Sequence, residues 1–138
     1  MPNRLKKGFT LIELLIAIFV LAVGIVAVLE MFPLGTYVQK SAQMGTLASE
    51  LCQEKMEEII SESYNNILPG VNEEPYGFNS SLPSFKRKTE VNYFDPNNPQ
   101  VPPDQDLGIK KIEVTVFWKS PLGINEKEIK LATLISKR

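Results

Sequence analysis

An unbroken apolar run lies near the N-terminus of the chain. Residues 14–29 read LLIAIFVLAVGIVAVL and carry no charge, and with residues 9–13 and 30–32 the segment reaches about 24 residues. As a helix this length is about 36 Å, more than the roughly 30 Å of a bilayer's hydrocarbon core. Pro33 follows, where a proline ends or kinks a helix. We therefore expect a membrane-spanning helix over residues 9–32.

A second, amphipathic helical pattern runs from about Leu34 to Tyr64 and continues the first helix. We expect its apolar stripe to pack on a sheet, with Cys52 as a buried small hydrophobe rather than a reactive thiol. The EKMEEI run, residues 54–59, is expected to form a solvated acidic face rather than a metal site. The stripe recurs every three or four residues at Val38, Ala42, Gly45, Ala48, Cys52, Met56 and Ile59, and Leu47, Leu51 and Ile60 widen it.

The remainder of the chain predicts loops and β-strands. Residues 70–107 are rich in Pro, Asn, Ser and Asp and predict mainly loop, with one strand over Phe85–Phe94. Alternation over Ile109–Lys119 and Glu126–Ile135 predicts a hairpin, turning at residues 121–125. Its buried positions are Ile112, Val114 and Val116, with either Trp118 or Phe117. The expected fold class is α+β: a long helix, transmembrane then amphipathic, on an antiparallel sheet of three or four strands.

The amino-acid composition narrows the classes of function that are open to this chain. The chain has 138 residues, enough for one small domain outside the membrane, and a net charge of −1. It has no histidine and a single cysteine, which excludes an intramolecular disulfide, histidine-based triads and Cys/His zinc sites. We therefore expect no enzyme activity, no cofactor and no metal. The basic residues Arg4, Lys6 and Lys7 precede the apolar run and should stay in the cytoplasm, which leaves the C-terminal domain outside.

Glu13 is unusual because it lies a few residues inside the apolar run. A carboxylate at the centre of a bilayer costs about 2.5–3.5 kcal/mol, so such a residue implies a partner or a function. Near the interface the side chain can instead reach the headgroups, and both interpretations stand at this point. An ordinary secretory signal would be followed by a small-x-small cleavage site, and EMFPLGTYVQK after Leu29 has none.

The string KKGFTLIELLIAI resembles the class III signal of type IV prepilins. The resemblance implies that prepilin peptidase cuts between Gly8 and Phe9, that the same enzyme N-methylates Phe9, and that Glu13 is the carboxylate that guides assembly. It divides the chain into a leader (1–8), a transmembrane and filament-core helix (9–32) and a periplasmic or extracellular globular domain (33–138). The implied fold is the type IV pilin fold.

The resemblance further implies a structural filament subunit. Its partners would be other pilin subunits, prepilin peptidase and the inner-membrane assembly platform, without predicted nucleic-acid contact. It would lie in the bacterial inner membrane first and in a pilus or pseudopilus afterwards. Major pilins often close their C-terminal region with a disulfide, so a single cysteine favours a minor pilin. Such a subunit would help to initiate or modify a pilus that serves adhesion, twitching motility or DNA uptake. Minor pseudopilins of type II secretion are the alternative, and a membrane-anchored periplasmic binding domain is a third hypothesis from another class.

Two clusters of polar residues also have a possible binding role. Lys86, Arg87 and Lys88 form a basic group within the first predicted strand, which we interpret as the solvent face of that strand rather than a docking patch. Oxygen-bearing side chains in the loops could offer ligands to calcium, but their spacing matches no calcium loop and a solvated turn is favoured. These side chains belong to Asp95, Asn97, Asn98, Asp104 and Asp106.

Overall fold

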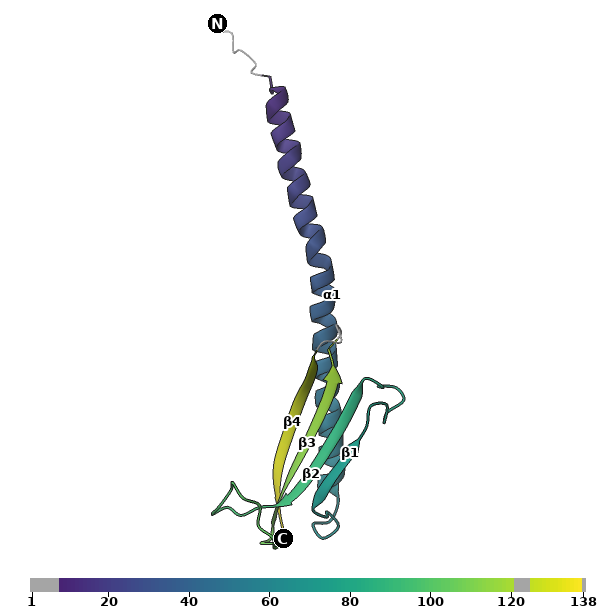
Figure 1. The fold of residues 1–138 in the computed structure, drawn as a ribbon, viewed down its shortest axis with the longest axis vertical. Helices are drawn as coiled ribbons and strands as arrows, with labels where there is room; N and C mark the ends of the chain where they lie inside the picture. Colours follow the sequence, from purple (N-terminus) through teal and green to yellow (C-terminus); the bar gives the residue numbers. More distant parts are fainter. Residues whose placement is uncertain (1–7, 121–124, 138) are drawn as a thin grey trace. The chain divides into compact units, whose positions relative to one another are not determined.

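The computed structural model describes residues 8–120 and 125–137 of the chain. It contains one long helix followed by four strands, and the strands form an antiparallel sheet (Figure 1). The elements are α1 (Leu11–Ser61), β1 (Gly70–Glu74), β2 (Phe85–Tyr93), β3 (Ile109–Lys119) and β4 (Glu126–Ser136). This confirms the expected α+β class with a long N-terminal helix. The chain divides into two compact units, Met1–Gln39 and Lys40–Arg138.

In the N-terminal unit, apolar side chains are exposed around the whole circumference of α1, from Leu11 to Leu34. Judged by length and composition, α1 is the one helix among the described residues that could cross a membrane. The helix continues through Pro33, although proline lacks the N–H that would bond the carbonyl one turn earlier. The hydroxyl of Thr36 donates a hydrogen bond to the Pro33 carbonyl at 2.9 Å.

The C-terminal unit contains the sheet, whose order β1-β2-β3-β4 follows the chain as a simple meander. Residues pair one to one along every ladder, from Phe85 opposite Trp118 in β2–β3 and from Lys119 opposite Glu126 in β3–β4. The turn predicted between β3 and β4 lies, at residues 121–124, outside the described residues. β1 falls where we expected loop: its sequence GVNEE is polar and exposed, so it lacks the alternation that reveals a half-buried strand.

The core lies between α1 and the inner face of β2 and β3. Four stripe residues of α1, namely Ala48, Cys52, Met56 and Ile59, are buried there as expected, together with Leu51. Opposite them, Ile112, Val114 and Val116 are fully covered. Trp118 rather than Phe117 lies on this face, because side chains alternate along a strand and Trp118 is two residues beyond Val116. The expected stripe is wrong at its ends, since Val38 and Ile60 are exposed, and α1 stops at Ser61, before Tyr64.

Cys52 is confirmed as a buried core residue. Its side chain is 1% exposed, and the sulfur lies 3.6 Å from the carbonyl oxygens of Val114 and Ile129. Burial raises the pKa of the thiol, so the thiolate needed for reactivity is disfavoured.

Candidate functional site

The N-terminal motif begins in non-helical backbone just before α1. Gly8 and Phe9 precede the first helical residue, Leu11, and the Phe9 side chain is 87% exposed. A Cβ built on Gly8 would meet nothing within 4 Å, so the peptide between these two residues is uncrowded. The leader residues Arg4, Lys6 and Lys7 lie outside the described residues. The structure therefore presents the Gly8–Phe9 bond on open, irregular chain.

Thr10 caps the helix that follows. Its carbonyl accepts a hydrogen bond from the Leu14 N–H at 3.2 Å, and its side-chain oxygen accepts one from the Glu13 N–H at 3.3 Å. Thr10 is therefore the N-cap, and Glu13 stands three residues on, the spacing of a capping box. Sequence reasoning missed this role of Thr10, although the Thr-x-x-Glu spacing was visible as a signal.

Glu13 lies in the first turn of α1 with its side chain exposed. The positive end of the helix dipole favours a carboxylate in this position. Within the described ranges 8–120 and 125–137, no cationic side chain lies within ion-pair distance of it. The motif thus combines an accessible Gly8–Phe9 bond, a capped helix start and a carboxylate that has no counter-ion among these residues.

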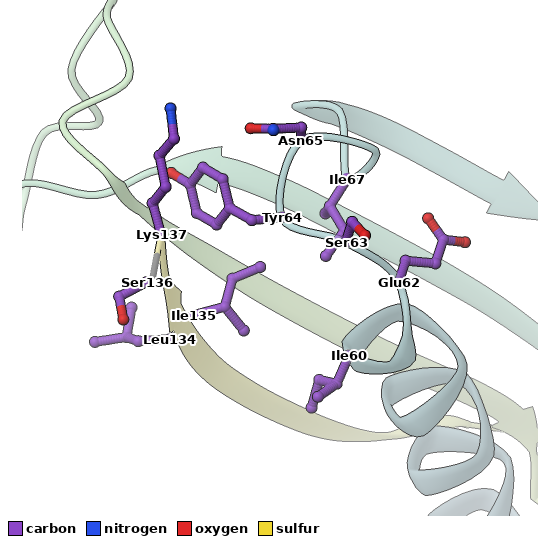
Figure 2. Close-up of a pocket in the computed structure, with 10 residues that line it drawn as sticks. All are labelled: Ile60, Glu62, Ser63, Tyr64, Asn65, Ile67, Leu134, Ile135, Ser136 and Lys137. Atoms are coloured by element: carbon purple, nitrogen blue, oxygen red, sulfur yellow. The ribbon is translucent and has the colours of Figure 1, made fainter.

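A second candidate site is a cavity of about 690 Å³ between the end of α1, the loop after it and the end of β4 (Figure 2). Its polar residues include Tyr64, whose hydroxyl donates to Asp106 at 2.5 Å. Burial and this bond raise the pKa of Tyr64 to about 12. The lining offers serine and tyrosine hydroxyls, Glu62 and Lys137, but no histidine to activate a nucleophile.

Next to this cavity, Lys110 fastens the loop after α1 to β3. Its ammonium group is buried, donates to the carbonyls of Tyr64 at 2.8 Å and Ile67 at 2.7 Å, and lies 4.0 Å from the centre of the Tyr64 ring. These contacts satisfy the charge with backbone oxygens and an aromatic face. Lys110 therefore has a structural role, which sequence reasoning did not anticipate.

Arg87 contradicts the expected solvent face of the basic group. Its side chain points to the inner face of β2 and the residue is 7% exposed, whereas Lys86 and Lys88 are only half-buried on the other face. The guanidinium donates to the Glu74 carboxylate at 2.5 and 2.9 Å and to the Leu51 carbonyl at 3.2 Å. Successive side chains of a strand point to opposite faces, so Arg87 lies on the inner face and its neighbours Lys86 and Lys88 lie on the outer face.

The Arg87 guanidinium also holds the pKa of the Glu74 carboxyl below its ordinary value. The two residues form a two-point ion pair between β1 and β2, and the pair reaches α1 through the Leu51 carbonyl. Arg87 therefore ties the short edge strand to the core.

The loop carboxylates that suggested calcium serve as turn acceptors. Asp95 accepts a hydrogen bond from the Asn97 N–H, and Asp106 accepts one from the Gly108 N–H, each at 2.8 Å. Gly108 has a φ of +86°, a conformation that side chains disfavour. In the described part of the chain, no three Asp, Glu or Cys side chains gather in a way that could hold a metal.

Comparison with known proteins bears on the N-terminal motif. Residues 3–29 match the family described as "Prokaryotic N-terminal methylation motif", which includes the Gly8–Phe9 bond, Thr10 and Glu13. No curated protein and no solved structure matched the chain. The chain therefore combines the N-terminal methylation motif with a pilin-like α+β fold, a long apolar helix followed by an antiparallel sheet.

Proposed function

We propose that the chain is a minor structural subunit of a type IV pilus, cut between Gly8 and Phe9, methylated at Phe9 and assembled through α1. The observation that carries this proposal is the position of the methylation motif: it covers the non-helical start, the cap and the first turns of a helix whose apolar side chains are exposed. Such a surface needs lipid or other helices around it.

Processing follows from the backbone at the cut. Prepilin peptidase must bring its catalytic groups close to the scissile carbonyl, and Gly8 presents no side chain in the way. The cut lies outside α1, so the peptidase need not unwind hydrogen-bonded helix to reach it. Arg4, Lys6 and Lys7 would keep the leader on the cytoplasmic side, where the peptidase removes residues 1–8.

Assembly follows from the charge that the cut creates. The new N-terminus at Phe9 is an ammonium group, and methylation leaves that charge in place. When the helix moves from lipid into the filament interior, the charge requires a counter-ion. The Glu13 carboxylate of an adjacent subunit supplies it, and the attraction in a low-dielectric interior is far stronger than in water. Pairing Phe9 with Glu13 sets the axial position of one subunit against the next.

Residues 9–32 would hold the subunit in the inner membrane until the assembly platform extracts it. Their exposed apolar surface suits the acyl chains first and neighbouring pilin helices later. Residues 33–138 would form the periplasmic or extracellular domain. The absence of a second cysteine supports a minor rather than a major subunit, because no disulfide can close this domain.

A minor pseudopilin of type II secretion is the second candidate, because it uses the same motif. Gene neighbours separate the two: retraction and minor-pilin genes favour the pilus, and secretin genes favour secretion. The amount of the subunit in purified filaments tests the minor role. A membrane-anchored binding domain is the third candidate function, and the cavity of Figure 2 is the feature that favours it.

Mass spectrometry of the protein isolated from its host tests the proposal. We expect a mature chain that starts at N-methylated Phe9. A chain that keeps Met1, or one cut beyond Phe32, would overturn the pilin function and leave the anchored binding domain as the better hypothesis.

A further inference from the structure

The outer strands of the sheet are β1 and β4, and among residues 8–120 and 125–137 no further strand pairs with either edge (Figure 1). β4 pairs with β3 residue by residue from Glu126 to Ser136, without a bulge, and no described strand takes up the backbone groups on its far side. Its second half, residues 131–135, reads LATLI and contains no charge, proline or glycine. A long edge of this kind is a ready partner for another strand.

The edges carry complementary side chains on one face of the sheet. The residue pairing across all four strands puts Glu73 of β1 level with Lys130 of β4, and Val71 level with Ala132. All four therefore lie on the outer face, away from α1, because residues that are level with one another share a face. Leu134 lies on that face too, two residues beyond Ala132.

These side chains are available for contact with another protein surface. Val71 is 58% and Leu134 is 52% exposed. In the described part of the chain, the carboxylate in ion-pair range of Lys130 is that of Glu113, at 3.9 Å, and Glu113 already pairs with Lys111 at 2.9 Å. Glu73 is exposed and, within the described ranges, no cation lies within ion-pair distance of it.

The strand directions make a second copy of this chain the fitting occupant. Successive strands are antiparallel, so β1 and β4 run in opposite directions within one sheet. A second sheet placed alongside in the same orientation brings its β1 antiparallel to β4 of the first. At the same level, Glu73 then faces Lys130, and Val71 stands opposite Ala132 and diagonal to Leu134, within reach for side-chain contact.

We propose that β4 of one copy pairs with β1 of the next, with Glu73 opposite Lys130. The contact is heterologous, since it joins two different surfaces and leaves a free β1 and a free β4 at the ends of the pair. It can therefore repeat along an assembly of like-oriented copies. The inference rests on the proposed function in that two copies anchored in one membrane by α1 share an orientation.

Disulfide trapping in the full-length protein tests the pairing. Two differently tagged copies are co-expressed, one carrying Glu73→Cys and the other Lys130→Cys, and are oxidised in the membrane. Directly opposed residues of antiparallel strands have Cα atoms about 4.5–5.5 Å apart, which a disulfide spans. We expect a mixed dimer that neither variant forms alone. Cys52 is buried and should not contribute. Glu113→Cys, on the same face but one strand inward of β4, is the control that should not cross-link to Glu73→Cys.

A second pair of cysteine variants keeps the test decisive if one of the first two variants folds poorly. Val71→Cys with Ala132→Cys should cross-link as well, and Glu73→Lys added to the first copy should lower that yield several-fold. Lys130→Glu in the other copy should then restore it. Absence of both mixed dimers overturns the proposal, and a Lys130→Cys homodimer without a mixed dimer shows that β4 pairs with β4 instead. The N-terminal mass separates the two hypotheses: normal processing at Phe9 without cross-links overturns the edge pairing alone.

Discussion

Thr10 accepts a hydrogen bond through its side-chain oxygen from the backbone N–H of Glu13, at 3.3 Å. The bond uses the backbone of Glu13 and leaves its carboxylate available. Helix capping and the proposed charge pairing at this residue are therefore separable, because a substitution of the Glu13 side chain keeps the N–H that Thr10 binds.

Glu13→Val should leave cleavage largely intact and impair assembly. The variant keeps the helix cap and loses only the carboxylate, so the Phe9 ammonium group would enter the filament unpaired. Leaving one buried charge without its partner costs about 3–5 kcal/mol, so we expect incorporation to fall at least about tenfold. Immunoblots of purified filaments and of membranes measure it.

Thr10→Ala is the matched control for that experiment. It removes the cap, worth about 0.5–2 kcal/mol, and keeps the carboxylate, so it should assemble far better than Glu13→Val. Normal filament content in Glu13→Val would show that the carboxylate is dispensable.

Gly8→Leu should block cleavage and leave the longer, basic form in the membrane. The structure has open space at Gly8, so the substitution should not disturb the chain itself, and the effect would arise in the peptidase. Gly24→Leu is the control, because Gly24 also has open space around it and lies inside α1. We expect its product to reach mature length. Electrophoresis and N-terminal mass report both, and a mature-length Gly8→Leu product would contradict the assigned cut.

Arg87→Met should destabilise the C-terminal unit by about 3 kcal/mol, because it leaves the partly buried Glu74 carboxylate without its cationic partner and removes the bond to the Leu51 carbonyl. Adding Glu74→Leu should recover part of the loss. Lys88→Met, next in sequence but on the outer face, should change stability by less than about 1 kcal/mol. Denaturant unfolding of the full chain in detergent, followed by the single Trp118, measures each, since Trp118 is 6% exposed in this core. Equal losses from Arg87→Met and Lys88→Met would contradict the assigned role of the ion pair.

Acid should weaken the same unit. The pKa of Glu74 lies below its ordinary value of 4.5, so the folded state binds this proton less tightly than the unfolded state does. The stability from the ion pair is complete above pH 4.5 and is lost as the pH falls through the folded-state pKa. Unfolding free energies measured from pH 7 down to pH 3 should decline, and more gently in Glu74→Gln. Parallel curves would show that Glu74 does not contribute to the acid sensitivity.

Local patterns in the sequence predicted the long helix, β2, the hairpin of β3 and β4, and the burial of Cys52. These succeed because apolar periodicity follows directly from which face is buried. β1 could not be predicted this way, since a short, exposed edge strand has no buried face to leave a pattern. It exists because β2 offers it a partner and Arg87 reaches Glu74 from the inner face.

The sequence by itself determined the N-terminal motif, since the Gly8–Phe9 bond, Glu13 and the apolar run lie within one short, contiguous stretch. Only the tertiary structure decided which polar residues are structural. Arg87 and Lys110 look like surface cations in the sequence, but they are buried because Glu74, Leu51, Tyr64 and Ile67, brought near by the fold, supply the oxygens that replace water. Likewise, Glu73 and Lys130 lie at the same level of the sheet because of the register of three successive strand pairs, which the sequence does not reveal.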